Sequence, residues 1–463
     1  DAREPCSVPE VPIFQTTPTL ITMNNLRPNI LSIKKLTFLG FLLAITPLYA
    51  QQVKKAEKAA ILLRNATLHT VSRGTVSGDL LIRDGLIADI GTNLAIHSGT
   101  AVLDCSGKHV YPGFIDGGSK VGLAEIGSIS VTNDFSELGD FIPHMKALTA
   151  VNPNSVSIPV TRVNGVTTVF AKPEGSTFPG TGALIDLFGY TPDQMSCGSE
   201  RVVMQFPSTG RRGRWDRRSD EDIKKETEKA LKNIDQVYES AIQYARIDSA
   251  AKADRQSWTT NNPQMEALLP VIRGQQPLFV EANSYTDITA LLDWISNKKI
   301  KVVLTGASEG WRVADRIARA GIPVITGPVL SVPRRENDRY DAMYTNAGKM
   351  AGAGVKVAIR TDESENTRNL PFNAGFAAAY GMGTDEALRA ITLTPAEIFG
   401  VQERYGSLDK GKVANLFVAT GDPFEMKTRI EKLFIRGWDI PLESRHTLLY
   451  DEFLERTPGN QKK

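Results

Sequence analysis

Apolar strand patterns and helical patterns alternate through the middle of the chain, from about residue 166 to residue 399. The strand candidates are 166–171, 183–188, 202–206, 278–281, 301–305, 323–326 and 355–361. The helical candidates are 219–254, 286–295, 311–320, 340–350, 384–393 and 395–399. Apolar strands that alternate with helices are typical of a parallel sheet covered by helices. About eight such units in roughly 290 residues predict a closed (β/α)₈ barrel of the α/β class.

Short strands with tight turns flank this region at both ends of the chain. One group lies within residues 57–112, where Asp84-Gly85 is a hairpin signal, and the other lies within residues 403–438. Each group alone is small for an independent domain. We therefore predict that the two groups form one composite β-sandwich, with the TIM-like barrel of residues 113–402 inserted between them.

Composition and charge narrow the class of protein. The 463 residues are 41% hydrophobic and 23% charged with a net charge of +2, which indicates a globular protein and argues against nucleic-acid binding. The three cysteines, Cys6, Cys105 and Cys197, lack the spacing of a zinc or redox motif. No apolar run is long enough to span a bilayer, so we expect no stable membrane anchor.

The first fifty residues have the features of a leader. Residues 1–22 lack periodicity, and we interpret them as a non-native or over-extended leader. Residues 23–50 combine a basic lead, the apolar run 36–45 and Ala50, which predicts a signal peptide and a mature start at Gln51. The alternative is an anchor helix, for which the run is too short. We expect a periplasmic or secreted protein.

The stretch 110–120, VYPGFIDGGSK, runs from one apolar strand through Pro112 and Gly113 into another that ends at Asp116. At this point the chain resembles the amidohydrolase superfamily, in which a Pro-Gly-Phe-Ile-Asp run leads into a metal-binding His-x-His at the end of the first barrel strand. The resemblance covers about residues 57–440 and is closest to the imidazolonepropionase-like branch. It also rests on GVKVAIRTD (354–362), ALRAITLTPAEIFGV (387–401) and GSLDKGKVANLF (406–417), where Asn415 replaces the usual Asp.

The resemblance implies a hydrolase that acts on C–N bonds other than peptide bonds and uses one or two divalent metal ions, usually zinc. Asp362 stands where the family has an aspartate that is both metal ligand and general base; the alternative is a turn or helix-capping aspartate. The other family positions lack their histidines. Gly118 and Lys120 replace His-x-His, Glu281 or Asn283 lies at strand five, and Gly306 lies at strand six.

The histidines elsewhere do not restore a zinc site. The chain has five, His69, His97, His109, His144 and His446, and only His144 falls in a barrel loop. One carboxylate together with Asp362 is a poor ligand set for zinc. No cofactor is therefore assigned, although a divalent metal is what the family implies.

Lysines after the first two barrel strands are candidates for a different chemistry. Lys120 is able to replace the metal as a fixed positive charge that attracts an anion, or to form a structural pair with Asp362. A buried lysine can also act as base or nucleophile. We predict catalytic roles for Asp362, Lys120 and Glu281, and substrate-binding roles for His144, Lys172 and Asn283.

Two function hypotheses follow. The first is a C–N hydrolase with an unusual or metal-free site, and the second is an inactive paralogue that binds a ligand or pairs with an intact relative. The expected partners are a small-molecule substrate or ligand, and a second copy or a paralogue. The basic segment 211–218 either grips an anion or is a solvated loop. Ser119 has no histidine in the sequence placed to activate it.

Overall fold

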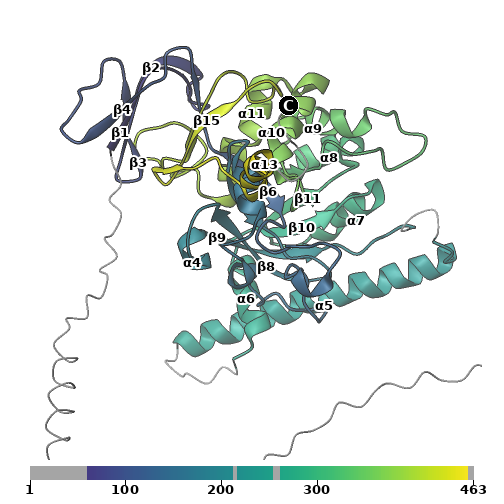
Figure 1. Cartoon of the computed structure of the whole chain (residues 1–463). Coiled ribbons are helices and arrows are strands. Elements are labelled where there is room, and N and C mark those ends of the chain that lie inside the picture. The colour runs from purple at the N-terminus through teal and green to yellow at the C-terminus, as the bar shows by residue number, and fades with distance from the viewer. Residues whose placement is uncertain (1–59, 212–215, 254–260, 457–463) are drawn as a thin grey trace, which may run out of the picture. The chain divides into compact units, whose positions relative to one another are not determined.

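The computed structural model describes residues 60–211, 216–253 and 261–456, which form two sheets and a set of helices (Figure 1). The predicted leader of residues 1–22, the predicted signal peptide of residues 23–50 and Gln51 lie outside the described residues. Among the described residues, no helix combines the length and the apolar character that a bilayer crossing needs.

The larger part of the fold is a barrel-like sheet of eight strands in the order β13-β12-β11-β10-β9-β8-β7-β6. The strands are β6 (Phe114–Ser119), β7 (Val166–Ala171), β8 (Gly180–Asp186), β9 (Ser196–Gln205), β10 (Leu278–Ala282), β11 (Val302–Gly306), β12 (Val324–Thr326) and β13 (Val357–Ile359). All residues of seven of these strands are buried, as expected for a sheet covered on both faces. The chain after β13 closes the barrel, because the Asp362 amide donates to the Gly118 carbonyl at 2.9 Å. The predicted TIM-like barrel is confirmed.

One strand runs against the expectation of an all-parallel barrel. β8 pairs antiparallel with both β7 and β9. The segments on either side of β8, residues 172–179 and 187–195, are too short for the crossover that two parallel strands require, which usually takes a dozen residues or more. β9 then pairs parallel with β10, so the remaining strands keep a common direction.

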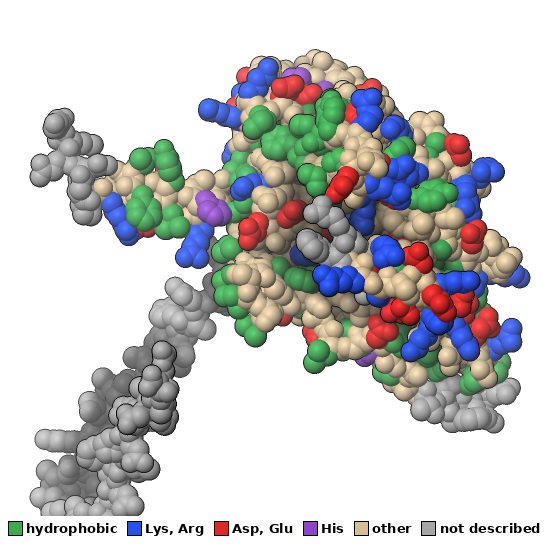
Figure 2. All heavy atoms as spheres, turned by 90° about the vertical axis from the view of Figure 1, so that its right-hand side faces the viewer, with side chains coloured by type: hydrophobic (Ala, Val, Ile, Leu, Met, Phe, Trp, Pro, Cys, Tyr) green, Lys and Arg blue, Asp and Glu red, His purple; other side chains and the backbone are tan. Residues whose placement is uncertain are grey.

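Helices lie on the outside of the barrel (Figure 1). They are α2 (Ala147–Ala150), α3 (Ser157–Arg162), α4 (Pro192–Met195), α5 (Asp220–Ala253), α6 (Pro263–Ile272), α7 (Tyr285–Ile295), α8 (Ala314–Arg319), α9 (Ala342–Gly352), α10 (Leu370–Ala377), α11 (Thr384–Ala390) and α12 (Leu393–Phe399), followed by α13 (Arg445–Glu455). The long helix α5 begins after Ser219, whose Oγ accepts from the Asp222 amide. Few of its residues are buried. Acidic and basic side chains are mixed on the face of the molecule drawn in Figure 2, as expected for a solvated surface.

Both chain ends contribute to the second sheet. It contains β1 (Ala60–His69), β2 (Thr75–Arg83), β3 (Leu86–Gly91), β4 (Thr100–Asp104), β5 (His109–Pro112), β14 (Leu416–Ala419), β15 (Ile430–Ile435) and β16 (Trp438–Ile440). β14 pairs antiparallel with β5, so the C-terminal strands continue the N-terminal ones. The turn between β15 and β16 lies against the turn between β2 and β3, since a Cβ placed on Gly437 would lie 2.7 Å from the Cα of Gly85. This sheet has a separate apolar core.

A buried polar cluster joins this sheet to the barrel. Asp186, at the end of β8, accepts from Arg436 Nε at 2.5 Å and from Asn415 Nδ2 at 2.8 Å. Thr168 and Tyr405 donate to the same carboxylate at 3.0 and 3.1 Å. Asn415 also accepts from the Arg436 amide. A carboxylate at position 415 would repel Asp186, which explains why an amide replaces the usual aspartate here. We call these five residues the junction cluster.

Candidate active site

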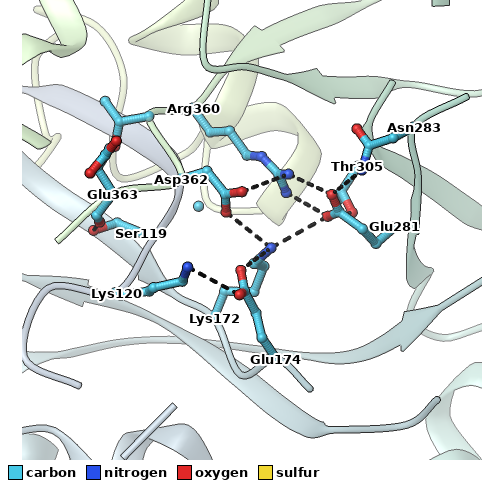
Figure 3. A network of polar contacts seen from close by, with 12 residues as sticks. Ser119, Lys120, Lys172, Glu174, Glu281, Asn283, Thr305, Arg360, Asp362 and Glu363 are labelled. Atoms are coloured by element: carbon cyan, nitrogen blue, oxygen red, sulfur yellow. Dashed lines mark hydrogen bonds and ion pairs between the residues drawn. The ribbon is translucent and has the colours of Figure 1, made fainter. Parts of the chain in front are cut away.

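Charged side chains from four strand ends converge at the carboxyl-terminal mouth of the barrel (Figure 3). They come from the residues after β6, from those after β7, from β10 and from those after β13. We call this set the mouth cluster: Lys120, Lys172, Glu174, Glu281, Arg360 and Asp362. It contains three cations and three carboxylates, and it lies where active sites of such barrels are found.

The inner part of the mouth cluster is a bidentate ion pair. Arg360 Nη1 and Nη2 donate to the two carboxylate oxygens of Glu281 at 2.7 and 2.6 Å. Asn283 Nδ2 and Thr305 Oγ1 also donate to Glu281, both at 2.9 Å. Burial alone would raise the pKa of Glu281, but the charges of Arg360 and Lys172 override this and hold it well below its usual value. Glu281 is therefore a fixed carboxylate.

Lys172 lies at the centre of the three carboxylates. Its Nζ is 2.8 Å from Glu174 Oε1, 3.1 Å from Asp362 Oδ1 and 3.4 Å from Glu281 Oε2. Burial and the charge of Arg360 act to lower the pKa of Lys172, yet the three carboxylates together raise it above its usual value. Lys172 thus remains an ammonium ion, which argues against a role for it as a neutral nucleophile.

Lys120 lies on the outer side of the mouth cluster. Its Nζ is 3.1 Å from Glu174 Oε2 and lies over the ring of Phe135, 5.1 Å from the centroid. The prediction that Lys120 pairs with Asp362 is wrong. Asp362 contacts Lys172 and, through Oδ2, Arg360 Nη2 at 3.3 Å. The buried Lys172 takes the aspartate, while Lys120 points outward, where its side chain remains 24% exposed.

The residues of the mouth cluster do not fit a metal ion. A Cβ placed on Gly118, at the family's ligand position, would lie 3.0 Å from Arg360 Cδ. At Gly306 it would lie 2.5 Å from Asn283 Oδ1 and 2.6 Å from Glu281 Oε1. Each carboxylate of the cluster already faces a lysine or arginine. Within the described ranges, no group of His, Cys, Asp and Glu side chains is arranged to hold a metal.

Other sequence-predicted residues divide between the cluster and its surroundings. Lys172 belongs to the mouth cluster, and Asn283 contacts it through Glu281. Among the described residues, no hydrogen bond or ion pair links His144 to the cluster. Ser119 Oγ donates to the Glu363 carbonyl at 2.9 Å, so it supports the chain rather than acting as a nucleophile. Asp116 accepts from Thr361 Oγ1 at 2.6 Å, and burial raises the pKa of its carboxyl to about 7.

Arg360 is the site residue that the sequence predictions did not include. It is 1% exposed and is among the largest fully buried side chains of the described chain. The available signal was a charged residue directly after the apolar run VAI, since a buried charge requires a partner. The position of Glu281 at the end of another buried strand supplied that partner.

The described part of the basic segment is occupied by ion pairs. Arg211 Nη2 lies 2.6 Å from Asp220, and Arg218 pairs with Asp216 and Glu226. Arg211 also donates to the carbonyl groups of Asp216 and Arg218. These contacts favour a solvated loop before α5 over an anion-binding site.

Comparison with known proteins shows which proteins this barrel resembles. A sequence profile described as the amidohydrolase family matches residues 302–438. The structure of an amidohydrolase from Thermotoga maritima superposes with a TM-score of 0.73 at 25% identity and covers 82% of this chain and 99% of that one. The chain is therefore similar to the amidohydrolase family in sequence over residues 302–438, and to an amidohydrolase in structure over most of its length.

Curated relatives match shorter stretches. An N-substituted formamide deformylase of Arthrobacter pascens is 29% identical over 136 residues, which are 26% of this chain and 25% of that protein. An imidazolonepropionase of Flavobacterium psychrophilum is 33% identical over 105 residues, 20% of this chain and 26% of that protein. The chain therefore matches about a quarter of the length of each.

Proposed function

We propose that the barrel mouth is a metal-independent active site that hydrolyses C–N bonds, other than peptide bonds, in small molecules. The observation that supports this proposal is the mouth cluster, in which Lys172 and Arg360 are paired with carboxylates. The cluster lies beside Gly118 and Gly306, which align with two metal-ligand positions of the family. The names of the two curated relatives support the C–N bond as the target. The residues of this chain supply the charge stabilisation.

Asp362 and Lys120 are the groups placed to meet a substrate. Both side chains are about one-quarter exposed, whereas those of Arg360 and Glu281 are almost fully buried. Asp362 would accept a proton from the attacking water. Lys120 carries three N–H donors and contacts one carboxylate among the described residues, so it has donors to offer a developing oxyanion. Glu281, Lys172 and Asn283 then act as positioning residues.

A second candidate function is ligand binding without catalysis. The observation that favours it is the double pairing of Asp362, which lies 3.1 Å from Lys172 and 3.3 Å from Arg360. These contacts engage both carboxylate oxygens, Oδ1 with Lys172 and Oδ2 with Arg360, so neither oxygen is free of a cation when a water molecule approaches. In this case Lys120 would hold the anionic group of a bound small molecule.

Hydrolysis assays separate the two candidates. N-acyl, formamide and cyclic amide compounds would be incubated with the wild-type protein, with and without a chelator, and with Asp362→Asn and Lys120→Met. Lys108→Met is the matched control, because Lys108 forms a similar partly exposed pair with Glu431 in the second sheet. We expect chelator-resistant turnover that Asp362→Asn abolishes and Lys108→Met leaves unchanged. Turnover that survives Asp362→Asn, or none at all with retained ligand binding, would contradict the hydrolase.

We also propose that the protein is exported through the leader of residues 23–50. The basis is its basic lead and apolar run. Mass spectrometry of the protein from its native host would show an N-terminus at Gln51. A chain that keeps residues 23–50 would contradict export by cleavage.

A further inference from the structure

We infer that Lys172 and Arg360 together stand in for a divalent metal ion, and that Gly118 and Gly306 provide the space for this replacement. The inference concerns which cation the barrel mouth holds, and it is independent of whether the site hydrolyses a substrate. It makes Arg360 and Lys172 positioning residues, whose charge holds three carboxylates in place.

The arrangement of oxygen atoms supports this replacement. Carboxylates from β10, from the segment after β7 and from the segment after β13 all lie within 3.4 Å of Lys172 Nζ. Arg360 bridges two of these, Glu281 and Asp362. Oxygen atoms from several strand ends that surround one cationic centre are the arrangement that hard divalent ions require. Here a nitrogen atom of the chain occupies the centre.

The glycines support it from the steric side. Gly118 and Gly306 stand at two family ligand positions, and a side chain at either would meet Arg360, Glu281 or Asn283. Gly306 adopts φ 84°, which favours glycine in any case, but Gly118 is not in the left-handed region. The lack of a side chain at position 118 is therefore explained by Arg360, because a Cβ placed on Gly118 would lie 3.0 Å from Arg360 Cδ. The backbone conformation does not require a glycine here.

Charge balance makes the replacement testable. Three cations offset three carboxylates in the wild-type cluster, which gives no net attraction for an added ion. Lys172→Met leaves one carboxylate in excess, and Lys172→Met with Arg360→Met leaves two. Glu174 and Asp362 are partly exposed and can turn toward an incoming ion. An added hard cation should then bind where the ammonium was.

The experiment is a titration of Mn²⁺ followed by thermal unfolding and by the electron paramagnetic resonance of bound Mn²⁺. We expect a melting temperature that is independent of Mn²⁺ in the wild type and rises with Mn²⁺ concentration in Lys172→Met and more steeply in the double variant. Arg436→Met is the matched control. It removes the partner of one buried carboxylate, Asp186, which has no second carboxylate beside it in the junction cluster, so Mn²⁺ should not affect it.

The outcomes are distinct. A double variant that folds only with Mn²⁺ supports the inference, and if it fails to fold at all, Lys172→Met carries the test. If the melting temperature of Lys172→Met does not respond to Mn²⁺, or if that of Arg436→Met responds equally, the inference is overturned. The proposed metal-independent hydrolysis is then untouched. A Mn²⁺ response of the wild type as large as that of Lys172→Met would overturn both this inference and the proposed metal-independent hydrolysis.

Discussion

The junction cluster and the mouth cluster are two buried ion-pair systems with different composition. At the junction, one carboxylate, Asp186, receives one arginine and three neutral donors. At the mouth, three carboxylates are matched mainly by lysine and arginine. The side chain of Asp186 is fully buried, whereas Asp362 and Glu174 are each 26% exposed.

The difference separates a structural pair from a site. Neutral donors satisfy a buried carboxylate without further charge, and they fix the contact between two parts of the fold. Several like charges held together by buried cations are costly to desolvate and are typical of functional positions. The mouth cluster also remains reachable from solvent through Lys120, and the junction lies between the barrel and the second sheet.

The largest effect is expected from removing the C-terminal strands at the junction. A chain that ends before Gly406 lacks β14, β15 and β16, so β5 loses its neighbour and Asp186 loses Asn415 and Arg436. We expect the N-terminal strands to unfold as well, because each part alone buries too little apolar surface. Circular dichroism during thermal unfolding measures this. A truncated protein with its full cooperative transition would disprove the shared sheet.

Breaking one arginine pair in each cluster compares them directly. Arg360→Met should lower the free energy of unfolding by about 3–5 kcal/mol, the range for a buried pair that loses one partner. Arg436→Met should cost less, since Asp186 keeps Thr168, Asn415 and Tyr405 as donors. Urea unfolding of both variants gives the ranking. A larger loss for Arg436→Met would reverse our reading of the two clusters.

The glycine beside the mouth cluster offers a sharper test of close packing. Gly306→Ala places a methyl group 2.5 Å from Asn283 Oδ1, at a position whose backbone has φ 84°. Gly354→Ala has a similar φ of 89° but meets nothing within 4 Å, so it measures the backbone cost alone. We expect Gly354→Ala to lower the free energy of unfolding by about 1–2 kcal/mol. Gly306→Ala should lower it by roughly a further 1–3 kcal/mol. Equal losses would mean that the cluster tolerates the added atom.

The pH dependence of stability should follow the mouth carboxylates. The pKa values of Glu281 and Glu174 are lowered in the folded protein. Their contribution to the free energy of unfolding is therefore fully present above the pKa of an unfolded glutamate, about 4.3. It is lost as the pH falls through their lowered pKa values in the folded protein. The pKa of Lys172 is raised, so its contribution is lost only as the pH rises above about 10. Urea unfolding from pH 3 to 7 should show a weaker acid dependence for Glu281→Gln; an unchanged profile would argue against the fixed ion pair.

The smallest effect on stability is expected for the outer pair. Lys120 and Glu174 are partly exposed, so Lys120→Met should change the free energy of unfolding by less than about 1 kcal/mol. Lys108→Met in the second sheet should behave alike. Thermal unfolding compares them, and a loss several times larger for Lys120→Met would place Lys120 in the structural core of the cluster.

The sequence predicted the barrel and the strand ends that form its mouth, because periodicity and the strand-end rule depend on local pattern. It placed Asp362, Lys120, Glu281, Lys172 and Asn283 in or beside the mouth cluster. It did not predict which charges pair, since that depends on side-chain direction and burial: Lys172 takes Asp362, and Lys120 takes Glu174. The sequence did not predict that β8 runs antiparallel to its neighbours. The short connections on both sides of β8 were the available signal, but we interpreted β8 as one more strand of a regular alternation.

The metal content of the protein tests the central claim most directly. The protein would be produced in zinc- and manganese-supplemented medium, purified without chelator, and measured by elemental analysis together with the concentration of folded chain. We predict no stoichiometric metal and an unchanged melting temperature after chelator treatment, because Arg360 and Lys172 occupy the cationic centre. Stoichiometric zinc or manganese, lost together with stability on chelation, would contradict the account.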